Sequence, residues 1–188
     1  VQAVEQALYD WAPRELAESW DNVGLLVGDP DAPVSRILIA LDITPAVVRE
    51  AADTGCQLIV AHHPVMNCAW HQVQTLRTDD RQGMVLTDLV RHNIAAICMH
   101  TNLDAAEGGV NDILARTLEL NDLEMLTEEK IGRVGTLKCE LPLVEFLPFV
   151  IKSLGCHGLR YVSCGKDVHR VAVGGVAFGC YIPQAIAA

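Results

Sequence analysis

Short apolar runs alternate with helical stretches through the first half of the chain, and this alternation constrains the fold more than any other feature. Two helices are predicted between the runs, one at 45–52 with Thr44 as a plausible N-cap and Pro45 in the first turn, the other at roughly 84–91. The runs read as buried strands at 24–28, 37–41, 58–61 and 94–99. The order predicts an α/β fold with a mixed sheet and flanking helices.

The rest of the chain predicts a second, smaller lobe. A helix should follow Gly108 and Gly109 and end near residue 118, with an acidic loop (Glu124, Glu128, Glu129) after it. Strands at 133–137, 159–164 and 169–175, and a helix from Pro142 toward residue 153, would build the second unit. We place a first α/β lobe at 1–125 and the start of a second at 126–188.

Composition narrows the class of protein. With 14 basic and 24 acidic residues the net charge is −10, which disfavours direct DNA binding. No run approaches the roughly 20 apolar residues of a membrane-spanning helix, so a cytoplasmic protein without membrane contact is predicted. Seven cysteines without a C-x-x-C pair read as reduced, mostly buried thiols. The chain starts at Val1 and ends in an uncapped helical stretch, so we expect it to be truncated at the carboxyl end.

Two adjacent histidines, His62 and His63, follow the strand at 58–61 directly and precede Pro64. Neighbouring residues of a strand point to opposite sides, so the two imidazoles suit two metal ions a few ångströms apart better than one ion. The alternative is a hydrogen-bonded strand end without a metal.

A second polar motif follows the strand at 94–99. His100 and Asp104 should lie at the same edge of the sheet as the paired histidines, with Asp104 as a metal ligand. His100 and Asn102 could orient ligands from outside, as could Asp42 after the strand at 37–41. Asp104 could instead be the N-cap of the next helix, and Asp42 a turn or cap residue.

The remaining histidines and three arginines are predicted to be ordinary surface or core residues. Four histidines have no ligand-like neighbours in sequence: His71, His92, His157 and His169. Three arginines could supply positive charge to a site, but we expect them to be solvated at the surface: Arg77, Arg81 and Arg91. Neither a G-x-S-x-G elbow nor an H-E-x-x-H helix is present, so metal-assisted chemistry is the enzymatic reading that remains.

Four blocks together resemble the Nif-three-like family, also called GTP cyclohydrolase 1 type 2. They are WDNVGLLVGDP (20–30), ALDITPAVVREA (40–51), LIVAHHPVM (58–66) and MHTNLDAAEGGVND (99–112). The resemblance implies a two-lobed α/β protein in a toroidal homohexamer, with a dinuclear site whose ligands include His62, His63 and Asp104. The family completes its site with a G-H-x-x-[ST]-E block, which this sequence lacks.

The resemblance is consistent with three hypotheses about function. A metal-dependent hydrolase would open the imidazole ring of GTP, or act on another nucleotide, with formate released. A non-enzymatic scaffold or regulatory partner, or a metal-delivery protein, would use the same ligands without turnover. Zinc is favoured for the two divalent ions, and iron, manganese or cobalt would suit the same ligand types.

Overall fold

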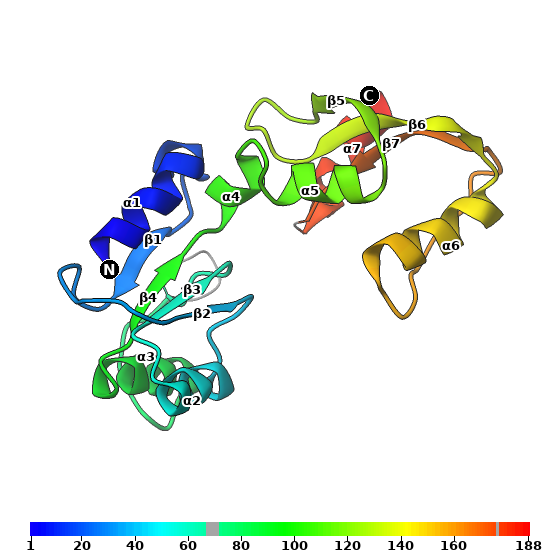
Figure 1. Ribbon diagram of the computed structural model, residues 1–188. Helices are drawn as coiled ribbons and strands as arrows, with labels where there is room; N and C mark the ends of the chain where they lie inside the picture. The colour runs from blue at the N-terminus through cyan, green and yellow to red at the C-terminus, as the bar shows by residue number, and fades with distance from the viewer. Residues whose placement is uncertain (67–71, 176) are drawn as a thin grey trace. The chain divides into compact units, whose positions relative to one another are not determined.

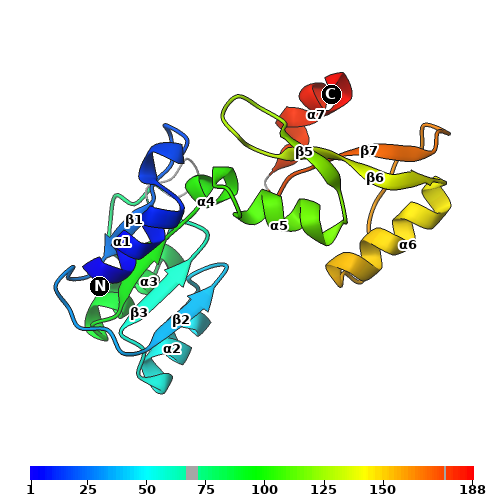
Figure 2. The same ribbon diagram turned by 45° about the horizontal axis from the view of Figure 1, so that its top comes forward.

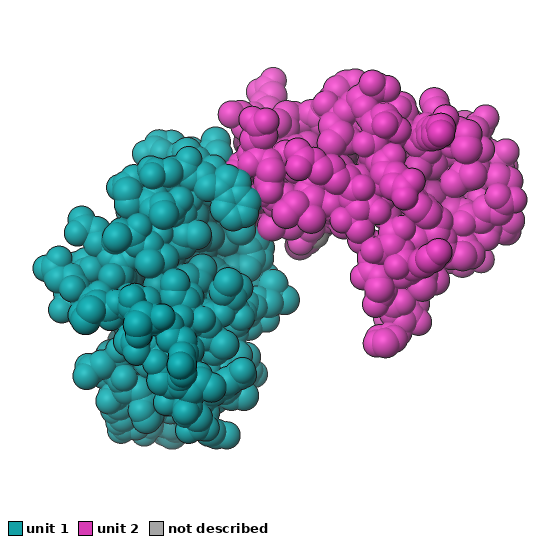
Figure 3. All heavy atoms as spheres, in the orientation of Figure 1, with its two compact units in different colours: residues 1–103 teal, residues 104–188 magenta. Residues whose placement is uncertain are grey.

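The computed structural model describes residues 1–66, 72–175 and 177–188. The chain forms two compact units, Val1–Leu103 and Asp104–Ala188, coloured separately in Figure 3. The lobe boundary predicted after residue 125 falls inside the second unit. No helix in the described ranges has the length and apolar character that crossing a membrane requires.

A four-stranded mixed sheet organises the first unit (Figure 1). Its order is β1-β4-β3-β2; β2, β3 and β4 are parallel, and β1 is antiparallel to β4. The strands are β1 (Gly24–Val27), β2 (Ile37–Ala40), β3 (Leu58–Ala61) and β4 (Ala95–Cys98). All four predicted strands are confirmed, and the mixed α/β class with them.

Helices cover both faces of this sheet, with α2 and α3 on one face and α1 on the other (Figures 1 and 2). The unit contains α1 (Gln2–Trp11), the 3-10 turn η1 (Arg14–Leu16), α2 (Pro45–Thr54), α3 (Arg81–Arg91) and the beginning of α4 (Thr101–Ala105). Helix α2 starts as predicted, because the Thr44 hydroxyl accepts a hydrogen bond from the Val47 amide. The apolar sides of α2 and α3 pack on Ile59, Ala61 and Ala96 in one core.

The second unit is built on an antiparallel sheet of order β5-β6-β7. Its elements are α5 (Val110–Thr117), β5 (Asn121–Met125), β6 (Arg133–Leu141), α6 (Leu143–Leu154), β7 (Val168–Val173), η2 (Phe178–Tyr181) and α7 (Ile182–Ala187). Apolar residues of α5 and α6 pack against β6 and β7, with Ala115, Leu137 and Val173 buried.

Several predictions for the second part of the chain are wrong. Residues 159–164 are not a strand, because Tyr161 and Val162 are exposed and no described strand pairs with them. Glu124 lies in β5 rather than in a loop, and pairing with β6 stabilises this polar strand without burial. Of the six described cysteines only Cys56 and Cys98 are buried, so the expectation of mostly buried thiols fails; Cys68 lies outside the described residues.

Candidate metal centre

The parallel pairing of β3 and β4 brings the two histidine motifs to one edge of the sheet. Ala61, the last residue of β3, is in register with Cys98, the last of β4. His62 and His63 follow the first strand and His100 follows the second, so all three leave the sheet at its carboxyl edge. The predicted convergence of the two motifs is confirmed.

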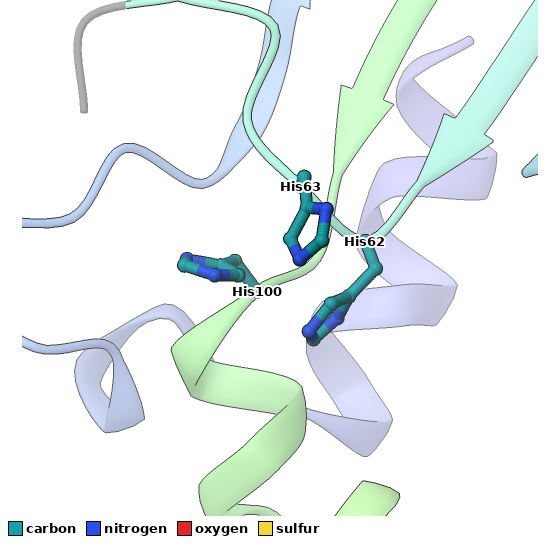
Figure 4. Close-up of side chains that lie close together, drawn as sticks. All are labelled: His62, His63 and His100. Atoms are coloured by element: carbon teal, nitrogen blue, oxygen red, sulfur yellow. The ribbon is translucent and has the colours of Figure 1, made fainter. Parts of the chain in front are cut away.

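The three imidazoles form one group that could hold a metal ion (Figure 4). One ligand atom from each lies within 4.8 Å of the others. The ring centroids of His62 and His63 are 5.1 Å apart, and His100 is 5.0 Å from His62 and 5.6 Å from His63. The divergence expected of neighbouring strand residues is therefore wrong, because β3 ends at Ala61 and the alternation of a strand no longer applies.

Each of the three rings is oriented by a hydrogen bond at its Nδ1 atom. His62 Nδ1 lies 2.9 Å from the Met99 carbonyl oxygen, and His63 Nδ1 lies 2.7 Å from Asp42 Oδ1. His100 Nδ1 lies 2.9 and 3.0 Å from the two carboxylate oxygens of Asp21. A carbonyl or carboxylate oxygen accepts, so each neutral ring carries its proton on Nδ1 and its lone pair on Nε2. A histidine that binds a metal through Nε2 adopts this tautomer and donates its Nδ1–H to such an acceptor.

Asp21 is the residue of the site that sequence reasoning missed. Its side chain is fully buried, and besides His100 it accepts hydrogen bonds from the Thr101 amide at 3.0 Å and the Thr101 hydroxyl at 2.5 Å. Burial alone would raise its pKa, but the hydrogen bonds from His100 and Thr101 outweigh burial and lower the pKa below its usual value. Asp21 therefore stays an ionised acceptor that fixes His100.

His62 is held in its neutral form by its surroundings. Burial is the largest cause, and the nearby His100 and His63 add to it, lowering the pKa of His62 to about 4. The Met99 carbonyl and Asp21 act in the opposite direction and only partly offset the effect. A neutral imidazole is the form that binds a cation, so His62 is ready to act as a ligand throughout the physiological range.

The other predicted residues take distinct places. Asp42 contacts His63, as expected of an acceptor that orients a ligand, while Thr44 rather than Asp42 caps α2. Buried Asn102 accepts a hydrogen bond from the His100 amide at 3.0 Å and donates one to the Ala12 carbonyl at 2.8 Å. It thereby holds the backbone at His100.

Asp104 is completely buried on α4, four residues after His100, and it begins the second compact unit. Helix α5 has Gly109 as its N-cap, so the alternative role of Asp104 as a cap is wrong. Its role as a metal ligand stays a prediction from sequence.

Three of the four histidines without ligand-like neighbours in sequence are exposed, as expected of surface residues: His92, His157 and His169. His71 lies outside the described residues.

The donor set fits a divalent cation. An ion bound about 2.0–2.1 Å from each imidazole nitrogen holds its donors roughly 3–4 Å apart, so small rotations of the three rings suffice. A cavity of about 700 Å³ adjoins this group, with His63 and Asp42 in its wall. Together they define an α/β protein with a histidine-rich candidate metal centre that opens onto a cavity.

The comparisons with known proteins place the chain in a family. A model of the Duf34/NIF3 (NGG1p interacting factor 3) family matches residues 1–188, and the chain belongs to this family. A protein of Clostridium perfringens (strain 13 / Type A), called a GTP cyclohydrolase 1 type 2 homolog, is 37% identical over 171 residues, covering 87% of this chain and 64% of that protein. A protein of the same name from Halalkalibacterium halodurans is 39% identical over 167 residues, covering 86% and 42%.

A solved structure supports the fold. The Staphylococcus aureus hypothetical protein SA1388 has a TM-score of 0.87 and 27% sequence identity, over 98% of this chain and 74% of that chain. Of the two curated relatives, the chain spans 64% of the Clostridium perfringens protein and 42% of the Halalkalibacterium halodurans protein.

Proposed function

We propose that this protein is a metal-dependent hydrolase of a small molecule, centred on His62, His63 and His100. The observation that carries the proposal is the set of three Nδ1 contacts, to Met99, Asp42 and Asp21. Three side chains that follow two strand ends are thus each held by an acceptor at Nδ1, and one ring nitrogen of each lies within 4.8 Å of the others.

The residues would divide the work by position. The three histidines would hold the ion, with Asp104, predicted from sequence, as a carboxylate ligand. Asp21, Asp42 and the Met99 carbonyl would keep the rings aligned. A bound divalent cation supplies Lewis acidity, which polarises the bond under attack and acidifies water.

The finer parts of the proposal rest on family membership. Two divalent ions are proposed, with zinc favoured and iron, manganese or cobalt as alternatives. GTP is the first substrate to test, because the curated relatives carry the name GTP cyclohydrolase 1 type 2 homolog. A toroidal homohexamer and a cytoplasmic location complete the proposal.

The first experiment measures metal content per chain by plasma mass spectrometry. It compares the parent protein with His100→Ala, and with His92→Ala as a matched control because His92 is exposed at the end of α3. We expect at least one ion per chain in the parent and in the control, and a clear loss in His100→Ala. A parent that takes up no zinc, iron or manganese when these are added would overturn the proposal.

The second experiment asks whether binding leads to turnover. The loaded protein is incubated with GTP and with other nucleotides, and released formate or phosphate is measured. Hydrolysis that disappears in His100→Ala supports the hydrolase. A stable metal content with no turnover of any nucleotide would favour the scaffold or metal-delivery hypothesis instead.

A further inference from the structure

The cavity beside the candidate metal centre has the size of a small-molecule site. Its volume of about 700 Å³ lies within the roughly 300–1,000 Å³ that ligand pockets occupy. Its polar wall comes from the segments that follow β2 and β3, including the N-cap of α2, and from the start of α3, all in the first unit. The polar lining residues are Asp42, Thr44, His63, Asp80, Arg81 and Gln82.

The acidic groups of this wall already have protein partners. Asp42 accepts at 2.7 Å from His63, and Asp80 caps α3 by accepting from the Gly83 amide at 3.0 Å. The Gln82 side-chain amide donates to the Val65 carbonyl. Both carboxylates of the wall are thus engaged as acceptors within the protein.

Arg81 differs from these polar residues of the wall in its hydrogen bonding. Over residues 1–66, 72–175 and 177–188, its guanidinium makes no hydrogen bond and no ion pair. The two other arginines that the sequence offered as local positive charge are neutralised, Arg77 by Asp79 and Arg91 by Asp88. The structure thus separates three arginines that the sequence could not distinguish.

We propose that Arg81 is an anchor for an oxyanion, a carboxylate or a phosphate, on the substrate of this site. A guanidinium presents a planar fork of donors that matches two oxygens of such a group, and the cavity connects Arg81 with the histidine centre through His63. The substrate would then be a small anionic molecule held at one end by Arg81, with its reacting part at the metal. This last step rests on the proposed function, whereas anion binding at Arg81 does not.

Calorimetric titration with two probes at fixed ionic strength tests the anchor. Tripolyphosphate represents phosphates and malonate represents carboxylates, and each is titrated into metal-free and zinc-loaded protein. We expect the parent to bind at least one probe, and Arg81→Gln to bind it about tenfold or more weakly, since a charge-assisted hydrogen bond is lost. Arg81→Lys should keep part of the affinity, because it retains the charge but not the fork.

Arg77→Gln is the matched control, because Arg77 is exposed, ion-paired and absent from the cavity wall. It should bind as the parent does. Equal binding by the parent and Arg81→Gln overturns the anchor, and so does a parent that binds neither probe in either metal state. Preference for one probe decides between phosphate and carboxylate.

Zinc content, measured on the same samples, separates this inference from the proposed function. We expect the parent and Arg81→Gln to hold equal zinc. If the parent takes up no metal, the proposed function fails, while the metal-free titration still decides whether Arg81 binds an anion.

Discussion

Two clusters of polar side chains, one in each unit, differ in how their groups are paired and in how deeply they are buried. In the second unit, Arg133 is 1% exposed and donates to Asp112 and to the carbonyl oxygens of Lys130 and Gly132 at 2.8 and 2.9 Å. In this cluster the guanidinium donors of Arg133 are paired with oxygen acceptors of the protein. In the first unit, each of the three histidines uses its Nδ1 atom on a protein acceptor, and one ring nitrogen of each lies within 4.8 Å of the others.

This difference in pairing indicates whether a polar cluster has a structural or a metal-binding role. In a buried cluster whose charges cancel internally, each charge offsets part of the desolvation cost of the other, so removing one partner is destabilising. A cluster that brings several metal-ligating atoms to one place suits a cation from outside. The following predictions test that contrast, from the largest expected effect to the smallest.

Arg133→Met should be the most destabilising change. It removes the guanidinium that pairs with the carboxylate of Asp112, and we expect a loss of about 3–5 kcal/mol in the free energy of unfolding. Urea unfolding measures the loss. Arg91→Met is the control, because it breaks an exposed pair with Asp88 and should cost at most about 1 kcal/mol. Similar values for the two variants would contradict the structural reading of the Arg133 cluster.

Asp21→Asn should weaken metal binding by about 10–100-fold, because it removes the buried carboxylate that fixes the tautomer and orientation of His100. Competition with a chelator measures the affinity. Asp31→Asn, at an exposed position, should leave the affinity unchanged. If both variants bind metal as the parent does, Asp21 does not position a ligand.

The metal-free protein should lose stability as the pH falls from about 6.5 to about 4. The pKa of His62 is about 4 in the folded protein and 6.5 in the reference state, so the unfolded chain takes up the proton first. The free energy of unfolding therefore decreases with falling pH in this window and is independent of His62 above it. We expect an effect on the order of 1 kcal/mol after solvent screening.

Urea unfolding of the parent and of His62→Gln at several pH values measures the contribution of His62 together with its coupling to His63 and His100, because the titrating groups elsewhere are common to both. The difference between the two proteins should change across the window in the direction given. A difference that stays constant from neutral pH to the lower end of the window would show that His62 is not held neutral.

Asp42→Asn should have the smallest effect, a loss of metal affinity below about tenfold. Asp42 contacts His63 as Asp21 contacts His100, but its side chain is 55% exposed, so water can replace the lost acceptor. The same chelator competition measures it. A loss larger than that of Asp21→Asn would reverse the proposed ranking of the two carboxylates.

Much of the first unit could be predicted from the sequence, because its signals are local. Strands β1 to β4 are short apolar runs between turn residues, and the Thr44-Pro45 pair marks the start of α2. The strands of the second unit were harder to predict from the sequence. Strand β5 is polar and exposed and is stabilised by its pairing with β6, while 159–164 has strand-like composition but no strand partner among the described residues.

The candidate site divides in the same way. His62, His63 and the location of His100 at the same sheet edge followed from motifs beside predicted strands. The position of His100 within the candidate ligand group depends on ring positions that no local pattern encodes. Asp21 lies 79 residues before His100 in sequence, and only the folded chain brings the two side chains together.

The sequence by itself therefore determined the strand order along the chain, the two histidine motifs and the family, because these depend on neighbours in sequence and on composition. The tertiary structure alone decided which acceptor holds each imidazole and which of the arginines 77, 81 and 91 lines the cavity without a partner among the described residues. The physical reason is that hydrogen bonds and ion pairs depend on distances of a few ångströms between segments that are far apart along the chain.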